Sequence, residues 1–307
     1  MLIRDVNMII ARYICRPSDM LLIDMNHIDW STLSCNAHPR AIALLHANPH
    51  RINWVRLNEN EHPDGIALLR ENPDRIVWWR LCENTHSDAI ALLRTNPTKI
   101  NWQCLSGNTH SGAIAMLLRE MPDKIDWVFL SRNKCPDAIS LLRANQDRIV
   151  WWALSMNEHG DAIALLRANQ DKINWTQLSA NEHSDAIALL CENPTQIVWQ
   201  RLCRNAHPDA IAMLCANPDR IDWKWLSLNT HPDAIALLHT NPDKIDWSWF
   251  SARAHTDDGI ALLRANQNKI VWNRLSCNPA LFTPDPVGYH TNLDQMIKLL
   301  TRMHTKA

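Results

Sequence analysis

A tryptophan recurs along most of the chain at steps of 24 residues, with two steps of 25. Self-similarity at a fixed period of this length is the signature of stacked repeat architectures, in which each unit is covered by its neighbours. No other feature of the sequence constrains the fold as strongly. The array predicts an α-solenoid over residues 28–278. Its eleven anchor tryptophans are Trp30, Trp54, Trp78, Trp102, Trp127, Trp151, Trp175, Trp199, Trp223, Trp247 and Trp272.

Each unit carries the signals of two short helices. Pro232 stands where a first helical turn tolerates a missing N–H, and Asp233 follows beside the positive end of that helix. Asn241 and Pro242 then predict the start of the next helix, with asparagine as its N-cap. We therefore expect an all-α fold of about eleven helix-turn-helix repeats, each about 24 residues long.

The two ends of the chain differ from the repeats, as terminal units of an array do. Residues 1–27 predict an N-terminal helical cap, with helices over 2–15 and 18–25. Residues 279–307 predict a proline-rich turn and an amphipathic capping helix over 291–303. Two one-residue insertions interrupt the period, and the sequence places them at residues 115–118 and 256–258.

Charge and cysteine usage exclude several functional classes. Lys plus Arg is 31 against 32 for Asp plus Glu, so no net basic field attracts nucleic acid. The nine cysteines contain no C-x-x-C pair, which favours reduced thiols over a disulfide or zinc framework. No run approaches the roughly 18 apolar residues of a membrane span, and the first residues lack the unbroken apolar stretch expected of a signal peptide. We expect a protein that is intracellular and neither secreted nor in a membrane.

Motifs for catalysis or cofactor binding were not found. The chain has six glycines and lacks the phosphate-binding, dinucleotide-binding, nucleophile-elbow and zinc-protease patterns. The sequence therefore predicts no enzyme, no cofactor and no metal, and it makes a small-molecule ligand improbable.

A histidine follows the anchor tryptophan by eight positions in nine units. Zinc needs nitrogen ligands about 2.0–2.1 Å away, whereas equivalent residues of neighbouring repeats are about 10 Å apart. We expect each histidine to cap or pack the start of a helix; a functional ladder is the alternative. The nine are His38, His62, His86, His110, His159, His183, His207, His231 and His255.

An asparagine follows the anchor tryptophan by six positions in every unit except the one with Arg253. Asparagine tolerates the left-handed conformation that ends helices, and it hydrogen-bonds to exposed backbone. A structural role is therefore expected, for example for Asn36, Asn229 and Asn278.

Arginines form a further ladder at the end of one helix, where RNA-reading repeats place side chains. A cation in the last turn of a helix is favourable in itself, and an aspartate at the other end completes an ordinary dipole pattern. The dipole explanation is preferred to RNA binding. The ladder comprises Arg70, Arg94, Arg119, Arg143, Arg167 and Arg264.

The positions directly after the anchor tryptophans vary most between units. Aromatic and arginine side chains are the usual anchors of protein interfaces, so these positions are candidates for partner binding. The alternative is that the rings pack over the seams between repeats. The candidates are Trp79, Phe129, Trp152, Trp225, Trp249, Arg56, Arg80, Arg201, Lys224 and Arg274.

The unit itself resembles the tandem repeats of giant and other large DNA viruses. Residues 241–247 read Asn-Pro-Asp-Lys-Ile-Asp-Trp, which is the phrase of that family, and residues 278–282 are similar to its closing phrase. The junction before each Ala-Ile pair is two residues longer than is usual there. The resemblance implies a virus-encoded helical repeat protein, located in the host cytoplasm or the virion.

Residues 5–14 and 18–22 also resemble an F-box-like head, although the customary Leu-Pro start is missing. Three functional hypotheses follow. The first is a protein–protein interaction scaffold, the second an F-box-like ubiquitin-ligase substrate adaptor, and the third an RNA-binding repeat protein.

Overall fold

The computed structural model of the protein describes residues 28–275 and 278. Every regular element among these residues is a helix, and none of them belongs to a strand, which confirms the all-α repeat fold. The capping helices expected in residues 1–27 and 279–307 lie outside the described residues.

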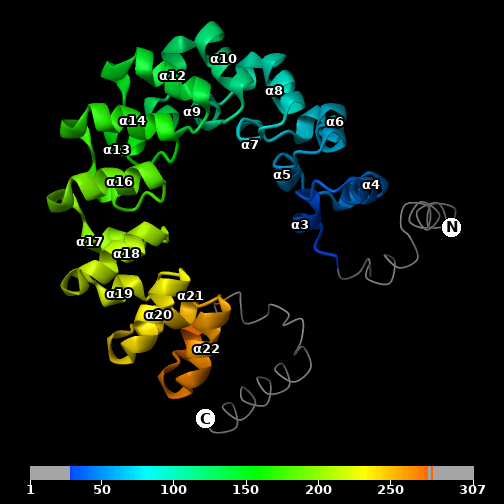
Figure 1. Cartoon of the computed structure of the whole chain (residues 1–307). Helices are drawn as coiled ribbons and strands as arrows, with labels where there is room; N and C mark the ends of the chain where they lie inside the picture. Colours follow the sequence, from blue (N-terminus) through cyan, green and yellow to red (C-terminus); the bar gives the residue numbers. More distant parts are fainter. Residues whose placement is uncertain (1–27, 276–277, 279–307) are drawn as a thin grey trace. The chain divides into compact units, whose positions relative to one another are not determined.

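One short α-helix of each repeat begins at the anchor tryptophan. We call these the tryptophan helices (Figure 1). They are α3 (Trp30–Ser34), α5 (Trp54–Leu57), α7 (Trp78–Leu81), α9 (Trp102–Gly107), α11 (Trp127–Arg132), α13 (Trp151–Leu154), α15 (Trp175–Leu178), α17 (Trp199–Leu202), α19 (Trp223–Leu226), α21 (Trp247–Arg253) and α23 (Trp272–Leu275).

A longer helix carries the Ala-Ile-Ala-Leu-Leu segment of each repeat. We call these the leucine helices. They are α4 (Pro39–Ala47), α6 (Pro63–Glu71), α8 (Ser87–Arg94), α10 (Ser111–Glu120), α12 (Pro136–Ala144), α14 (Gly160–Ala168), α16 (Ser184–Glu192), α18 (Pro208–Ala216), α20 (Pro232–Thr240) and α22 (Asp257–Ala265).

A single 3₁₀ turn connects each leucine helix to the next tryptophan helix. These turns are η1 (Pro49–Arg51), η2 (Pro73–Arg75), η3 (Pro97–Lys99), η4 (Pro122–Lys124), η5 (Gln146–Arg148), η6 (Gln170–Lys172), η7 (Pro194–Gln196), η8 (Pro218–Arg220), η9 (Pro242–Lys244) and η10 (Gln267–Lys269).

The Asn-Pro pair does not start the tryptophan helix, so that part of the prediction is wrong. Asn241 is the C-cap of α20, and its Nδ2 donates to the carbonyl oxygen of Leu237 at 3.0 Å. The pair then enters η9, and α21 begins only at Trp247, where Asp246 Oδ1 accepts the backbone N–H of Trp249 at 3.1 Å. The last carbonyl groups of a helix have no intrahelical partner, and the asparagine side chain supplies one to the preceding helix.

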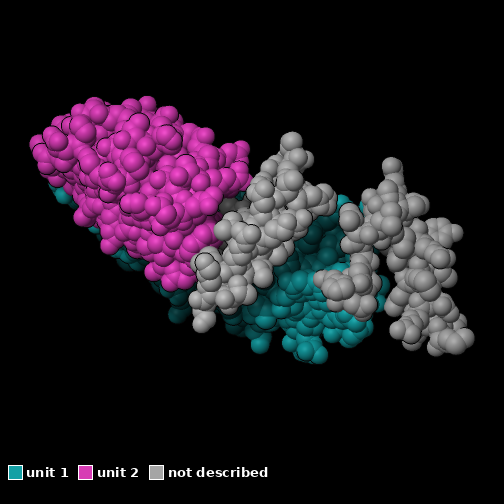
Figure 2. Space-filling view, turned by 90° about the horizontal axis from the view of Figure 1, so that it is seen from below, with its two compact units in different colours: residues 1–174 teal, residues 175–307 magenta. Residues whose placement is uncertain are grey.

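The array divides into two compact units, residues 1–174 and 175–307, whose boundary falls directly before an anchor tryptophan (Figure 2). Within each unit the same order of tryptophan helix, leucine helix and 3₁₀ turn repeats. The tryptophan helices pack on one another and on the leucine helices, for example α11 on α9 and on α12.

Leucines are among the fully buried residues, whereas the anchor tryptophans are not. Leu154 of α13 and Leu166 of α14 are both 0% exposed, and equivalent residues recur in the other repeats. The anchor rings are only partly buried. Several lie under a cation from the following 3₁₀ turn: Arg51 over Trp30 at 5.2 Å, Arg148 over Trp127 at 5.9 Å, Lys172 over Trp151 at 5.0 Å and Lys244 over Trp223 at 4.5 Å.

One hydrogen bond joins consecutive repeats through the side chain four positions after the anchor tryptophan. Ser106 Oγ accepts the backbone N–H of Asp126 at 3.0 Å and donates to the carbonyl oxygen of Trp102 at 2.8 Å. Cys82 takes the same place, with its Sγ accepting the N–H of Asn101 at 3.3 Å. The bond satisfies a backbone donor at the start of each tryptophan helix, where no intrahelical partner exists.

The asparagine six positions after the anchor tryptophan forms a second bridge. Asn229 Nδ2 donates to the carbonyl oxygens of Cys203 and Asn205 in the preceding repeat, at 2.9 and 3.0 Å. Its Oδ1 accepts the backbone N–H of His231 at 2.9 Å. The structural role predicted for these asparagines is confirmed, but their conformation is not left-handed: no non-glycine residue among those described has a positive φ. The asparagine contributes through the hydrogen bonds of its side chain, and its role does not require a left-handed backbone.

The two insertions are absorbed inside helices. The first lengthens α10, as expected, and places Met121 where the other repeats carry the asparagine that caps the leucine helix. The second lengthens α21 to Arg253 and does not lie at 256–258, which corrects the prediction. As a result Ala254, buried like the bridging asparagines, occupies their place, and Asn278 Nδ2 donates to its carbonyl oxygen at 2.8 Å.

We expect Asn229→Ala to lower the free energy of unfolding by about 2–3 kcal/mol, because two carbonyls and one N–H lose their buried partner. Ala254→Asn should raise it by about 1 kcal/mol by supplying the missing bridge. Urea denaturation followed by tryptophan fluorescence measures both. An unfolding midpoint of Asn229→Ala equal to that of the wild type contradicts the stabilising role of the bridge.

Candidate partner-binding surface

The residues one, two and five positions after the anchor tryptophan share one side of each tryptophan helix. At about 3.6 residues per turn they lie opposite the residues three and four positions after the anchor, which face the core. Leu130 and Ser131 of α11, at those two positions, are both 0% exposed. We call the surface formed by the positions one, two and five after the anchor the variable face.

The variable face is continuous from one repeat to the next. A Cβ added to Gly107 would lie 3.2 Å from Cδ1 of Phe129 in the following repeat. Arg204 stacks on the ring of Trp225, 5.5 Å from its centroid. In both pairs the residue five positions after one anchor contacts the residue two positions after the next anchor. Adjacent repeats therefore present one shared surface within each unit.

Unit 1 exposes three of the candidate rings on this face. Trp79 and Trp152 are each 44% exposed, and Phe129 is 39% exposed, so none of them is buried in a seam between repeats. Exposed aromatic side chains of this size are unusual outside interaction sites when they recur on one surface. The seam-packing alternative stays a prediction: the ring of Phe129 lies against Gly107 of the preceding repeat, although the residue is 39% exposed.

The candidate arginines of unit 1 are engaged within the chain. Arg56 Nη1 lies 2.7 Å from Glu59 Oε2, and Arg80 lies 3.5 Å from Glu59 and 3.2 Å from Glu83. The Arg80 guanidinium also stacks over the ring of Trp79, 4.2 Å from its centroid. These contacts neutralise the charge of this end of the face and hold the Trp79 ring in place.

Unit 2 presents a different variable face. Trp249 is 42% exposed, whereas Trp225 is half-buried beneath Arg204. Lys224 and Arg274 are exposed, and Arg201 is half-exposed. The structure thus places all ten candidates on the variable face, five in each unit.

The histidines cap helices, as predicted. In His86 the Nδ1 atom accepts the backbone N–H of Asp88 at 3.1 Å, and the same bond recurs for seven others. His255 differs, because Thr256 is the N-cap of α22. No group of three or more His, Cys, Asp or Glu side chains in the described part of the chain could hold a metal ion.

The arginine ladder lies at the ends of the leucine helices, away from the candidate residues. Arg70, Arg94 and Arg264 are exposed there, in the last turn, where the helix dipole favours a cation. Arg143 lies 3.6 Å from Asp161 of the next repeat. The ladder thus has the helix-end position that the dipole explanation requires.

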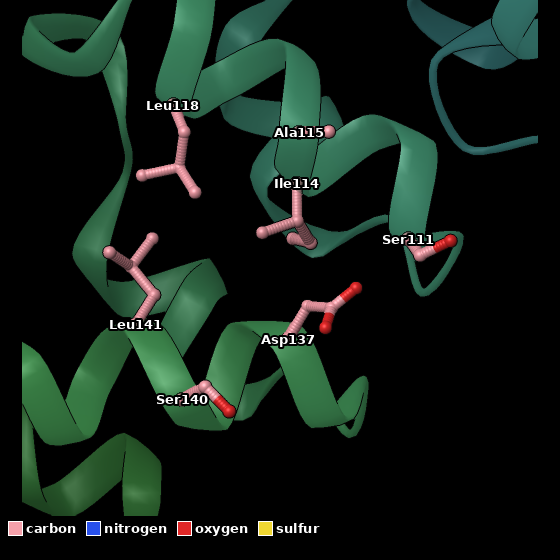
Figure 3. A pocket seen from close by; sticks show the side chains of 7 residues that line it. All are labelled: Ser111, Ile114, Ala115, Leu118, Asp137, Ser140 and Leu141. Carbon is pink, nitrogen blue, oxygen red and sulfur yellow. The ribbon is translucent and has the colours of Figure 1, made fainter.

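A shallow hollow of about 330 Å³ lies between α10 and α12, next to the first insertion (Figure 3). Its wall is largely apolar and includes Ile114, Leu141 and Leu118, which is 48% exposed. Asp137, Ser111 and Ser140 are its polar lining. No base, nucleophile and orienting group converge there, so the hollow lacks the arrangement of a catalytic site.

Cys82 and Cys203, two buried cysteines, are poor nucleophiles in this fold. Burial raises the pKa of the Cys82 and Cys203 thiols to about 11, so both remain protonated at neutral pH. The thiolate is the reactive form, and it is disfavoured here. Both sulfur atoms serve instead as acceptors for the backbone of the next repeat, at 3.3 Å.

Comparison with known proteins adds no relative: no family model matches the chain, and neither a curated protein nor a solved structure matches it. Among the described residues, no helix is long and apolar enough to cross a membrane.

Sequence reasoning missed the fifth position after the anchor. Glu59 and Glu83 pair with the candidate arginines, and Arg204 stacks on a candidate ring. The signal was present, because these positions vary between units as much as the first and second do. Helical geometry would have joined all three positions on one side.

The raised thiol pKa values predict a loss of stability in alkali. Between the ordinary pKa of 9.0 and about 11 the folded state keeps protons that the unfolded state releases, so the free energy of unfolding falls as pH rises. The double variant Cys82→Ser and Cys203→Ser keeps the acceptor and lacks the titration, so its stability should fall less. Thermal melts from pH 8 to 11 measure this, with exposed Cys191→Ser and Cys215→Ser as the control pair. Parallel curves for the buried-site variant and the wild type would refute the prediction.

Proposed function

We propose that the protein is a protein-binding scaffold whose variable face holds the partner. The observation that carries the proposal is the recurrence of exposed aromatic rings on the variable face within each unit: Trp79, Phe129 and Trp152 in unit 1, and Trp249 in unit 2. Rigid aromatic side chains contribute large contact area at a small cost in conformational entropy, and they dominate interface energetics.

The support for these rings comes from the repeat itself. The N–H that begins α13, at Val150, is bonded to Ser131, and Asn157 of the same repeat bonds to the carbonyl oxygens of Ser131 and Asn133. Trp152 therefore lies on a short helix that is hydrogen-bonded to the preceding repeat both at its start and just after its end. Preorganised anchors lose little freedom on binding, which favours affinity.

The setting of this scaffold is part of the proposal. The repeat phrase at residues 241–247 resembles that of large DNA viruses, which is consistent with a viral protein that acts in the host cytoplasm or the virion. The F-box-like adaptor hypothesis depends on residues 1–27, outside the described residues, and stays a prediction. The RNA hypothesis stays a prediction as well.

Loss of the exposed rings tests the function. We expect the double variant Trp79→Ser and Trp152→Ser to fold, because both side chains are exposed, and to lose at least one protein that the wild type retains from host extract. The matched control is Leu118→Ser with Met121→Ser, two exposed apolar residues on α10 and at its end. Purified partner should bind the ring variant at least about tenfold more weakly. An identical set of bound proteins for the ring variant, the control and the wild type rejects the proposal.

A further inference from the structure

Five cations lie on or beside the variable face of four consecutive repeats of unit 2. No acidic residue stands one, two or five positions after an anchor tryptophan in this unit. Arg201, Arg204, Lys224, Arg253 and Arg274 lie on or directly beside it; Arg253 is the extra residue of α21. Among the described residues, no carboxylate oxygen lies within 4.0 Å of any of the five. We call these five residues, with Trp225 and Trp249, the basic face.

The contrast with unit 1 shows that this charge is not a general property of the repeat. Two of the cations there have their own acids: Arg56 pairs with Glu59, and Arg80 pairs with Glu59 and Glu83. Arg132, five positions after its anchor, is exposed like Arg204 of unit 2, so unit 1 carries one such cation on this face whereas unit 2 carries five on or beside it. Because the whole chain has a net charge of −1, the basic face is a local excess of positive charge.

Two carboxylates at the starts of α19 and α21, beside the basic face, are already engaged. Asp222 Oδ1 accepts the backbone N–H of Trp225, and its Oδ2 accepts from Gln200 Nε2, both at 3.2 Å. Asp246 Oδ1 accepts the N–H of Trp249 at 3.1 Å. Both acids cap helix N-termini, where the helix dipole offsets part of their charge. They do not neutralise the five cations.

We propose that the basic face binds an extended acidic segment of a partner protein, in which Asp or Glu alternates with apolar side chains. The inference rests on the proposed scaffold function and names the chemistry of one partner. The carboxylates of the segment would meet the five cations, while its apolar side chains would pack on Trp249 and beside the half-buried Trp225. Equivalent residues of neighbouring repeats are about 10 Å apart, close to three residues of an extended peptide.

Two features favour a peptide over a single-stranded nucleic acid. Single-strand binders offer open aromatic faces on which bases stack, but Arg204 already lies over the Trp225 ring. A phosphate backbone also carries a charge at every nucleotide, so it would meet Asp222 and Asp246, both partly exposed at the ends of α19 and α21. A peptide can place uncharged residues at those two points.

Fluorescence anisotropy with the full-length protein tests the proposal. The probes are a labelled peptide of repeated Asp-Glu-Phe, the same peptide with Lys in place of both acids, and labelled oligo(dT). The test variant is Arg204→Glu, Lys224→Glu and Arg274→Glu. The matched control is Arg70→Glu, Arg94→Glu and Arg264→Glu, which reverses three exposed arginines at the ends of leucine helices. Circular dichroism melts confirm that both triple variants fold.

We expect the acidic peptide to bind the wild type and the control alike, with an affinity that falls as salt is raised. The test variant should bind it at least about tenfold more weakly, and the lysine peptide should not bind the wild type. Replacement of Trp249 by Ser should also weaken binding of the acidic peptide.

Three outcomes overturn the inference. The first is equal loss in the test and control variants, which indicates diffuse charge attraction. The second is binding of oligo(dT) without binding of the acidic peptide. The third is no binding of the acidic peptide at all; if Trp79→Ser with Trp152→Ser still loses a partner in that case, the scaffold function stands and only the acidic-partner assignment fails.

Discussion

The hydrogen bonds between repeats are the interactions on which this structure depends. Each repeat ends its helices after only four to ten residues, so a large share of backbone groups lack intrahelical partners. Asn229 alone satisfies three such groups, two of them in the preceding repeat. A buried donor or acceptor without a partner costs about 1–3 kcal/mol, so these side chains are required before hydrophobic packing can succeed.

Because other positions of the repeat form the core and the bonds between repeats, the variable face is available for binding. The core is built mainly by leucine, isoleucine and alanine and the seams by asparagine and serine or cysteine, while most residues one, two and five positions after the anchor lie outside the core; Ala153, which is 0% exposed, is an exception. These positions can therefore differ between repeats at little cost to the fold: Trp79, Phe129 and Lys224 occupy them on three different tryptophan helices. Surface substitutions away from caps and cores usually change stability by less than about 0.5 kcal/mol.

The period of the sequence predicted the fold class and the leucine helices, because burial periodicity and N-terminal proline act locally. It did not predict that the Asn241 side chain donates to a carbonyl oxygen of the preceding helix. An Asn-Pro pair is equally compatible with an asparagine that caps the preceding helix and with one that caps the following helix. The bridge from Ser106 to Asp126 was missed for another reason: the bond joins residues 20 apart, and no local pattern shows the partner. The ten candidate residues were found by variation, but the ion pairs of Arg56 and Arg80 with glutamates depend on side-chain conformations that the sequence does not show.

The irregular repeats show what the seam bonds permit. At the first insertion Met121 replaces the asparagine that caps a leucine helix, and the serine bond from Asp126 to Ser106 remains. At the second, Ala254 replaces a bridging asparagine, and the seam that lacks this bridge keeps the serine bond from Asp246 to Ser227. One bridge per seam is thus enough to hold the register when the other is missing. The same lengthening leaves Leu118 and Met121 exposed in the first case and adds Arg253 beside the basic face in the second. Because the contact between two repeats tolerates the loss of one hydrogen bond, an inserted residue can add exposed side chains without interrupting the series of repeats.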